Sequence, residues 1–303
     1  MFLRFTAVLF ANAHILLCLT TLFWAGNFVL ARGVSGHFPP IALAWFRWTL
    51  AFMIILPFTI GQVRKDWPII KKHIPVLITL GVLGVGSFNT LSYIGLTHTT
   101  AINALILQSS GPILIAILAF LIFRDKVTRL QMIGILTSLI GVSIVILKAD
   151  IQTLAQLTFN VGDIWVFAAM VCWAVYTVFL RYRPSIHWKS LAAVTFFIGA
   201  VFVTPFYIWE HTNVAQVNFD IESLLSIGYV CIFPSVLAYI FYNRGVELIG
   251  PNRAGAYLHM GPFFGSFMAI IFLGEKIELF HIIGLSLILT GVIMTSKKQK
   301  GSS

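Results

Sequence analysis

Two stretches that share one pattern decide the fold: HMGPFFGSFMAIIFLGEK (residues 259–276) and SSGPILIAILAFLIFRDK (residues 109–126), which lie 150 residues apart. Both are almost wholly apolar, and both carry a Gly-Pro pair, which begins at Gly261 and at Gly111. Proline lacks a backbone N–H and clashes with the preceding turn, so a helix interior normally excludes it. A helix-weakening pair at matched positions in two apolar segments indicates a duplicated fold with a bent helix in each copy.

The same register continues on both sides of the Gly-Pro pair. Eight residues match without a gap at an offset of 150: Gly95, Ala104, Gly111, Pro112, Ala119, Lys126, Gly134 and Gly141 recur as Gly245, Ala254, Gly261, Pro262, Ala269, Lys276, Gly284 and Gly291. Upstream, WAGNFVLAR (24–32) is echoed by WAVYTVFLR (173–181) at an offset of 149. We therefore predict two repeats, residues 1–150 and 151–300, followed by a cloning remnant at 301–303.

The composition requires lipid as the main solvent. Of the 303 residues, 59% are hydrophobic and 10% are charged, against roughly 45–50% and 25% in soluble domains. A membrane-spanning helix needs about 20 mostly apolar residues. Ten segments meet that description: 10–31, 41–61, 74–94, 101–123, 130–147, 161–181, 190–209, 223–243, 254–273 and 279–296. The expected fold is thus an all-α integral membrane protein with ten transmembrane helices and no soluble domain.

The basic residues indicate which side faces the cytoplasm. If the N-terminus is cytoplasmic, sixteen Lys and Arg residues fall on that side, whereas Arg32, Lys148 and Lys276 fall on the other. This bias follows the positive-inside rule and predicts that both termini are cytoplasmic, in a bacterial inner (plasma) membrane. The formal net charge is +10, but the basic residues are spread over short loops, so we expect no binding to nucleic acid.

Each repeat contains five predicted spans. Because five is odd, the second repeat must enter the membrane from the opposite face, which gives an inverted-topology repeat. That arrangement is typical of secondary transporters, with a midplane site between the repeats and alternating access to it.

The run GPFFGSFMAIIFLGEKIELFHIIGLSLILTGVIM (261–294) resembles the hallmark of the EamA-type drug/metabolite transporter (DMT) superfamily. FRDK in the first half stands where the family prefers a Gly-Glu pair, and FWAGNFVLAR and FPPIALAWFRW are similar to the family's opening helices. The resemblance covers essentially the whole chain. It implies a ten-helix, exporter-like fold whose central cavity is lined mainly by helices 1, 3, 4, 6, 8 and 9, and it leaves the substrate open.

Polar and aromatic residues recur at helical spacing within six of the spans. Because polar side chains avoid lipid, we expect these faces to point inward and to bind substrate, although hydrogen bonds between helices would explain each residue singly. Such rings and amides suit a small zwitterion or amphipathic solute. The candidates are Trp24, Asn27, Asn89, Tyr93, Asn103, Gln108, Trp173, Tyr176, Tyr239, Tyr242, Tyr257 and His259.

Three further features have two interpretations each. The Gly111-Pro112 and Gly261-Pro262 pairs are candidates for cavity-shaping bends that flex during gating, or for static kinks. Arg47 lies about seven residues inside its span. It either binds a substrate carboxylate, or extends to the outer headgroups or bonds a neighbouring helix. Asp125-Lys126 and Glu275-Lys276 are expected to cap the helices that follow them.

The energy source is left open by the sequence. The chain has no GxxxxGK[ST] motif, and no Asp or Glu lies in the middle of a span. His259, and then His14, would be the candidates for proton coupling, although a lone His in a bundle more often makes fixed hydrogen bonds. We expect no cofactor and no metal, because the three Cys residues show no ligand spacing.

The sequence therefore predicts a secondary-active or facilitative transporter, not an enzyme. An exporter of small organic metabolites, with amino acids as the first substrate class, is favoured; export of cationic drugs or other metabolites in the same fold is the alternative. A polytopic enzyme is disfavoured because HExxH, GxSxG and clustered His/Asp/Glu are missing from the sequence. The expected partners are a small-molecule solute and the lipid bilayer, and a homodimer is left open.

Overall fold

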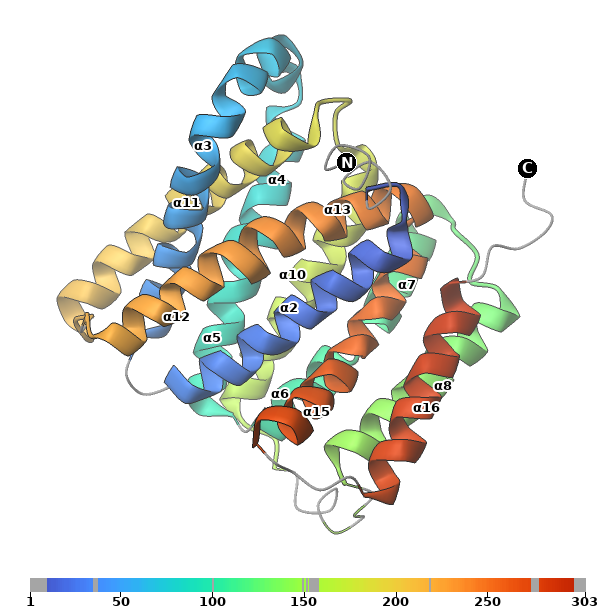
Figure 1. The fold of residues 1–303 in the computed structure, drawn as a ribbon. Helices are drawn as coiled ribbons and strands as arrows, with labels where there is room; N and C mark the ends of the chain where they lie inside the picture. The colour runs from blue at the N-terminus through green and yellow to red at the C-terminus, as the bar shows by residue number, and fades with distance from the viewer. Residues whose placement is uncertain are drawn as a thin grey trace, which may run out of the picture.

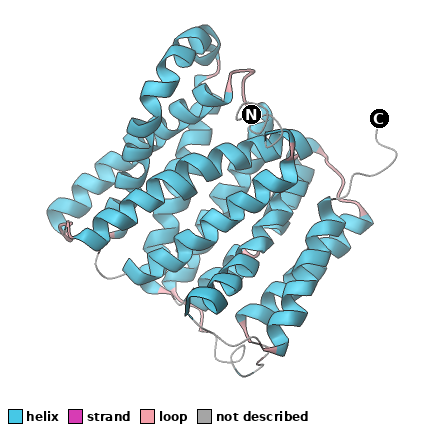
Figure 2. Cartoon of the chain, in the orientation of Figure 1, coloured by secondary structure: helices cyan, strands magenta, loops and turns pink. Residues whose placement is uncertain are grey.

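The computed structural model describes residues 10–34, 38–99, 101–148, 150, 152, 158–217, 219–273 and 278–296, and these residues form helices joined by short connections (Figures 1 and 2). The first repeat contains α2 (Ala13–Val34), α3 (Pro40–Lys72), α4 (Ile74–Leu80), the π-helical η1 (Gly81–Ser87), α5 (Phe88–His98), α6 (Ala101–Gln108), α7 (Gly111–Phe123) and α8 (Arg129–Ile146). The second contains α10 (Val161–Phe179), η2 (Leu180–Tyr182), α11 (Trp188–Asn213), α12 (Ile221–Cys231), the π-helical η3 (Ile232–Leu237), α13 (Ala238–Ile249), α14 (Pro251–Gly255), the 3₁₀ turn η4 (Ala256–His259), α15 (Met260–Leu273) and α16 (Leu279–Ser296).

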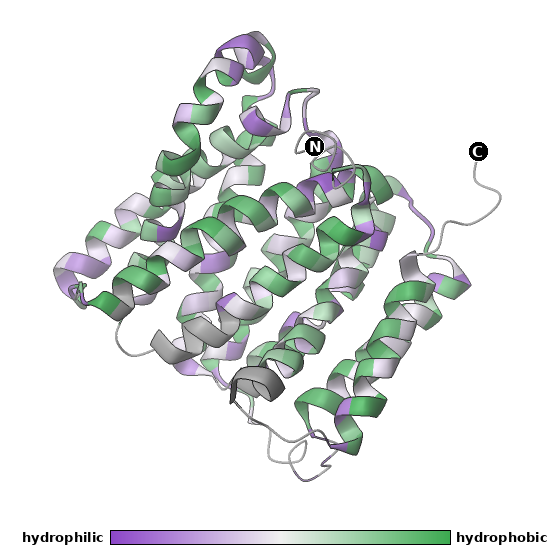
Figure 3. Cartoon of the chain, viewed as in Figure 1, coloured by the Kyte–Doolittle hydropathy of each residue, from purple (hydrophilic) through white to green (hydrophobic). Residues whose placement is uncertain are grey.

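Every predicted span corresponds to one helix or to consecutive helical pieces, which confirms the fold class. Eight segments of the described chain are long and apolar enough to cross a membrane, and α2 and the α14–α15 segment complete the ten. Large apolar side chains such as Phe58 and Leu225 are 76% and 70% exposed, as lipid contact requires. Hydrophobic residues occur along all of the helices, as the hydropathy colouring shows (Figure 3). The repeat boundary at residues 150 and 151 remains a prediction, since residue 151 lies outside the described residues.

The helix interruptions are duplicated along with the helices. The π-helical turn η1 begins at Gly81, and η3 occupies the matching part of the second repeat. Span four breaks at Ser109–Ser110, and span nine narrows into η4 at the matching place. Pro112 and Pro262 follow directly, in the first turns of α7 and α15. Proline is tolerated in a first turn because those N–H groups have no helical acceptor.

The last helices of the two repeats, α8 and α16, pack antiparallel along one edge of the bundle (Figure 1). A Cβ on Gly134 would lie 2.7 Å from the carbonyl oxygen of Gly291, and one on Gly291 would lie 2.4 Å from that of Gly134. Gly141 and Gly284 approach each other in the same reciprocal way, at 2.6 and 2.9 Å. Because the contact pairs the first matched glycine with the second, the helices run in opposite directions, and the inversion of the repeats is confirmed.

The second helices, α3 and α11, form the opposite edge and cap each other (Figure 1). The Glu210 carboxylate, near the end of α11, accepts the N–H groups of Ile41 (3.1 Å) and Ala42 (2.6 Å) in the first turn of α3. Asp66, near the end of α3, accepts the N–H of His187 (3.0 Å) and the hydroxyl of Ser190 (2.6 Å) at the start of α11. Each helix thus supplies the negative charge that the N-terminus of the other requires.

We predict that Gly141→Val destabilises the protein by about 1–3 kcal/mol, since the new side chain would collide with the backbone of α16. Thermal unfolding in detergent measures the change. Gly61→Val is the matched control, because a Cβ at Gly61, also in a helix, meets nothing within 4 Å. Equal stabilities for the two variants would contradict the close contact of α8 with α16.

We also predict a pH-dependent loss of stability for Asp66→Ala. Asp66 lies outside the predicted span. Burial raises the pKa of its carboxyl. The hydrogen bonds from Ser190, His187 and Gln62 lower the pKa and together outweigh burial, so the pKa lies below its ordinary value. The ionised form therefore stabilises the fold above the unfolded pKa of about 3.9, and this contribution disappears as the pH falls through the folded pKa.

At pH 7 the loss should be about 1 kcal/mol, typical of a helix cap, and it should shrink in acid. Asp66→Asn, which keeps an acceptor oxygen without the charge, should lie between wild type and Asp66→Ala. A stability difference that stays constant down to pH 3 would show that the ionised cap is not its source.

Candidate functional site

Three pairs of equivalent residues touch each other at the centre of the bundle. The rings of Trp24 and Trp173 meet edge to face, with centroids 5.0 Å apart. Asn89 Nδ2 donates to the hydroxyl of Tyr239 at 3.1 Å, and these positions are 150 residues apart. His259 Nε2 lies 2.8 Å from the carbonyl oxygen of Ser109, again 150 residues away. Equivalent positions of two inverted repeats can meet only at the pseudo-two-fold axis, so the axis passes through these contacts.

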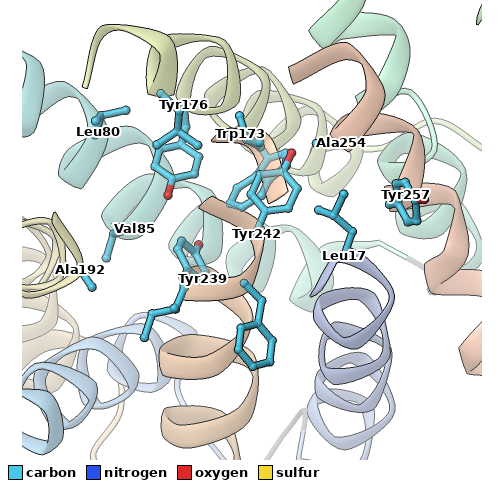
Figure 4. Close-up of a cluster of buried hydrophobic side chains, with 14 of the residues drawn as sticks. Leu17, Leu80, Val85, Trp173, Tyr176, Ala192, Tyr239, Tyr242, Ala254 and Tyr257 are labelled. Carbon is cyan, nitrogen blue, oxygen red and sulfur yellow. The ribbon is translucent and has the colours of Figure 1, made fainter. Parts of the chain in front are cut away.

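Aromatic rings from both repeats pack around this axis, in what we term the axial aromatic cluster. Trp173 is central, with its ring centroid 4.9 Å from that of Tyr242 and 5.1 Å from that of Tyr176 (Figure 4). The members other than Trp24 are at most 1% exposed. The cluster consists of Trp24, Trp48, Trp173, Tyr176, Tyr239 and Tyr242.

The phenolic hydroxyls of the cluster bind polar partners, as burial requires. Tyr239 donates to the carbonyl oxygen of Gly84 in η1 at 2.6 Å, while its oxygen accepts from Asn89. Tyr242 and Thr177 share a hydrogen bond of 3.0 Å, and Tyr176 donates to Asn243. Gly84 is necessary for this packing, because a Cβ there would lie 2.1 Å from the Tyr176 ring.

Arg47 points into the protein beside the cluster. Its side chain is 1% exposed, so the expectation that it extends to the headgroups is wrong, and helix–helix bonding describes it. The guanidinium donates from Nη1 to the hydroxyl of Tyr93 (2.8 Å), from Nε to Ser235 Oγ (2.6 Å) and from Nη2 to the carbonyl oxygen of Pro234 (3.0 Å). The Tyr93 hydroxyl in turn lies 3.4 Å from Asn27 Oδ1.

The π-helical turn η3 makes these acceptors available. Pro234 has no N–H for the carbonyl of Val230, one turn earlier, and the Ser235 hydroxyl donates to that oxygen at 2.7 Å instead. The carbonyl oxygen of Pro234 receives two side-chain donors from the first repeat, Trp24 Nε1 at 3.0 Å and Arg47. Single π-helical turns of this kind often mark functional sites.

Four of the predicted site residues lie away from the cluster. His259 uses both ring nitrogens, since Nδ1 lies 2.6 Å from Ser138 Oγ. Tyr257 bonds His14, and Asn103 donates to the carbonyl of Thr158 (3.0 Å) and to Asp163 Oδ2 (3.2 Å). Gln108 lies at the helix break, with its Nε2 buried.

The two Gly-Pro pairs differ in their surroundings. A Cβ on Gly111 would lie 2.7 Å from Met170 Cε, so α7 packs closely against α10, whereas a Cβ on Gly261 would meet nothing within 4 Å. Close helix approach therefore explains the first glycine alone. A gating role for both pairs stays a prediction.

In the described chain, the candidate residues do not form the open cavity that the sequence predicted at the midplane. Their rings fill that space, and two pockets of the described residues lie near helix ends instead. One, of about 310 Å³, is lined by Ile144, Lys148, Glu278, Leu279, Phe280 and Ile283, and the other, of about 570 Å³, by Ala11, Asn12, Ala13, His14, Leu248 and Ile249. The rings pack together because large aromatic side chains from both repeats converge on one axis.

The expected cap at Asp125 is also wrong. The helix that follows is capped by Thr128, whose hydroxyl accepts the N–H of Gln131 at 3.2 Å in a reciprocal capping box. Asp125 instead forms an ion pair of 2.8 Å with Arg181. Glu275 and Lys276 lie outside the described residues.

Sequence reasoning missed several residues of this site. Trp48 follows Arg47 directly and forms the floor of the cluster against Tyr239, with centroids 4.8 Å apart. Pro234 binds Arg47, and the proline within an apolar span was the available signal. Thr177 and Asn243, partners of the tyrosine hydroxyls, each lie one residue from a predicted site residue.

Comparison with known proteins identifies relatives of the whole chain. Residues 11–147 and 160–297 each match the model of the EamA-like transporter family. The chain is 32% identical to the uncharacterized transporter YyaM of Bacillus subtilis, over 94% of this chain and 93% of that protein. It is 27% identical to an uncharacterized transporter of Archaeoglobus fulgidus, over 95% and 99% of the two chains. A solved crystal structure shares the fold, with a TM-score of 0.74 at 18% identity, and the match covers 93% and 95% of the chains.

We predict that Tyr239→Phe destabilises the protein by about 1–3 kcal/mol, because the buried Gly84 carbonyl and the Asn89 amide both lose a partner. Thermal unfolding in detergent measures the loss. Tyr182→Phe is the control, since that side chain is 48% exposed. If Tyr239→Phe unfolds at the wild-type temperature, the hydroxyl does not link the repeats.

Proposed function

The chain belongs to the EamA-like transporter family, and on that premise we propose that it carries small organic metabolites, amino acids first among them, across the membrane. Transport proceeds by alternating access, in which the two repeats rock about the axial aromatic cluster. The residues that bind solute are the members of the cluster together with Asn27, Asn89, Tyr93 and Arg47. The protein lies in the bacterial inner membrane with both termini in the cytoplasm, and it exports its solute.

The observation that supports this proposal is the meeting of equivalent residues at the axis. A site on the axis is equally far from both membrane faces, so a small rotation of the repeats can open it to either side. The contacts that close the site join side chains of opposite repeats, as Tyr239 does with Asn89 and Trp24 with Trp173. Such contacts can part without unfolding either repeat.

Ion pairs support a closed face at one end of the bundle. Arg183 and Glu247 pair at 2.7 Å, and Arg244 pairs with the same carboxylate at 2.8 Å. Arg181 and Asp125 join the ends of spans six and four. All three arginines belong to the face that carries the excess of positive charge, which is the cytoplasmic face under the positive-inside rule.

The chemistry of the cluster favours an amphipathic solute with a ring or an apolar side chain. Indole and phenol rings offer apolar area and hydrogen-bond handles at one place. The two hydrogen bonds of His259 favour a fixed structural role for that side chain over a mobile proton carrier. A solute exchange or a facilitated flux therefore fits the described residues better than proton coupling through His259.

We predict that Trp173→Ala lowers the flux of labelled phenylalanine in proteoliposomes at least tenfold, while the protein still folds and inserts. Trp165→Ala is the matched control, because Trp165 lies on the same helix and is 39% exposed. Alanine variants of Trp24, Tyr93 and Tyr239 extend the test. Normal flux in all four site variants would place the solute elsewhere, and no flux of any amino acid in the wild-type protein would refute the substrate class.

A further inference from the structure

We infer that Arg47 binds the carboxylate of the solute and thereby restricts transport to zwitterions and organic anions. This inference rests on the proposed function and assigns the substrate class of the same site. It also separates the favoured substrate class, amino acids, from the alternative, cationic drugs.

The charge of Arg47 is isolated in the apolar part of the protein. Arg47 is the only Lys, Arg, Asp or Glu in the interior of the ten predicted spans. Span seven (190–209), which packs against the span of Arg47, has no charged residue. The three ion pairs that the structure describes all involve other arginines. A buried cation normally has an anionic partner, so a solute anion would complete this site.

The present partners of Arg47 are neutral and include two atoms that belong to the opposite repeat. Pro234 and Ser235 lie on η3, whereas Tyr93 lies on α5 of the repeat that carries Arg47. When the repeats rock apart, the guanidinium loses the first two acceptors and keeps the third. A carboxylate offers two oxygens to the planar fork of an arginine and forms stronger, charge-assisted hydrogen bonds than a carbonyl or a hydroxyl.

Aromatic rings of the protein also lie close to Arg47, where they would surround the apolar side chain of a bound amino acid. The carbonyl oxygen of Pro234 binds both Arg47 and the indole nitrogen of Trp24. The guanidinium carbon lies 4.9 Å from the centroid of the Trp48 ring, and Trp48 packs edge to face on Tyr239. A solute whose carboxylate binds Arg47 therefore has its apolar part among the rings of the axial aromatic cluster.

A cationic drug is unsuited to the same place. Like charges repel strongly where water is excluded, because the effective dielectric constant is low. The aromatic rings alone would attract a cation, but Arg47 lies beside them and opposes that attraction. The site should thus reject an amine that differs from a substrate only by the missing carboxylate.

The experiment compares three matched probes on the wild-type protein: phenylalanine, phenylalaninamide and phenethylamine. Two readouts are used, flux into proteoliposomes and the ligand-dependent shift of the unfolding temperature in detergent. We expect phenylalanine to be carried at least tenfold faster than the other two, and to be the one probe that raises the unfolding temperature. Carriage of phenethylamine as fast as phenylalanine, or an equal rise of the unfolding temperature with phenethylamine, would overturn the inference.

Variants test whether Arg47 is the source of the preference. Arg47→Gln should abolish the stabilisation by phenylalanine and lower its flux at least tenfold, and Arg47→Lys, which keeps the charge without the fork, should show an intermediate loss. Arg64→Gln, which removes an exposed arginine of the same helix, should leave both readouts unchanged. Stabilisation of Arg47→Gln by phenylalanine to the wild-type extent would overturn the inference.

Failure of the proposed function gives a different result. In that case none of the probes is carried, yet a temperature shift that requires the carboxylate and Arg47 would still establish the anion site. If Arg47→Gln does not fold, the comparison of the three probes on the wild-type protein decides. If phenylalanine does not shift the unfolding temperature of the wild-type protein, the proposed anion site at Arg47 is contradicted.

Discussion

In a bilayer, a backbone carbonyl that lacks its helical donor must find another donor within the protein. This constraint shapes the centre of the molecule. The π-helical turns η1 and η3 each present a carbonyl oxygen, of Gly84 and of Pro234, and each oxygen accepts a side-chain donor from the opposite repeat. The two interrupted turns are therefore bonded across the axis, so the repeats are joined by polar contacts as well as by apolar packing.

The backbone is more symmetric than the side chains. Interruptions recur at matched places in spans three and eight and in spans four and nine, but the residues at equivalent positions differ in chemistry. Asn89 faces Tyr239, and Ser109 faces His259. Arg47 has no charged counterpart in span seven. Under the proposed function, the duplicated backbone allows opening to either face, and the unlike side chains on the axis distinguish the two ends of a bound solute.

Much of this architecture could be predicted from the sequence, because lipid imposes length and hydropathy on every span and because the offset of 150 survives in Gly-Pro and in the paired glycines. The equivalence of Trp24 and Trp173 was visible as well. The π-helical turns could not be predicted, because proline and glycine, which mark them at Pro234 and in η1, are also found at ordinary helix kinks. The direction of Arg47 could not be predicted either: its long stem reaches both the headgroups and the axis, and the acceptors that decide between them come from residues nearly 190 positions away.

The edges of the bundle and its centre are held by different kinds of contact. At the edges, α8 meets α16 through glycine backbones, and α3 meets α11 through carboxylate caps on helix ends. These contacts involve the main chain and leave little room for displacement. At the centre, the repeats meet through long side chains that can exchange a protein acceptor for a solute atom. Under the proposed function, motion is therefore expected as a rotation that preserves the edge pairs and separates the central side chains, with the cost of separating Arg47 from Pro234 and Ser235 offset when a solute carboxylate replaces them.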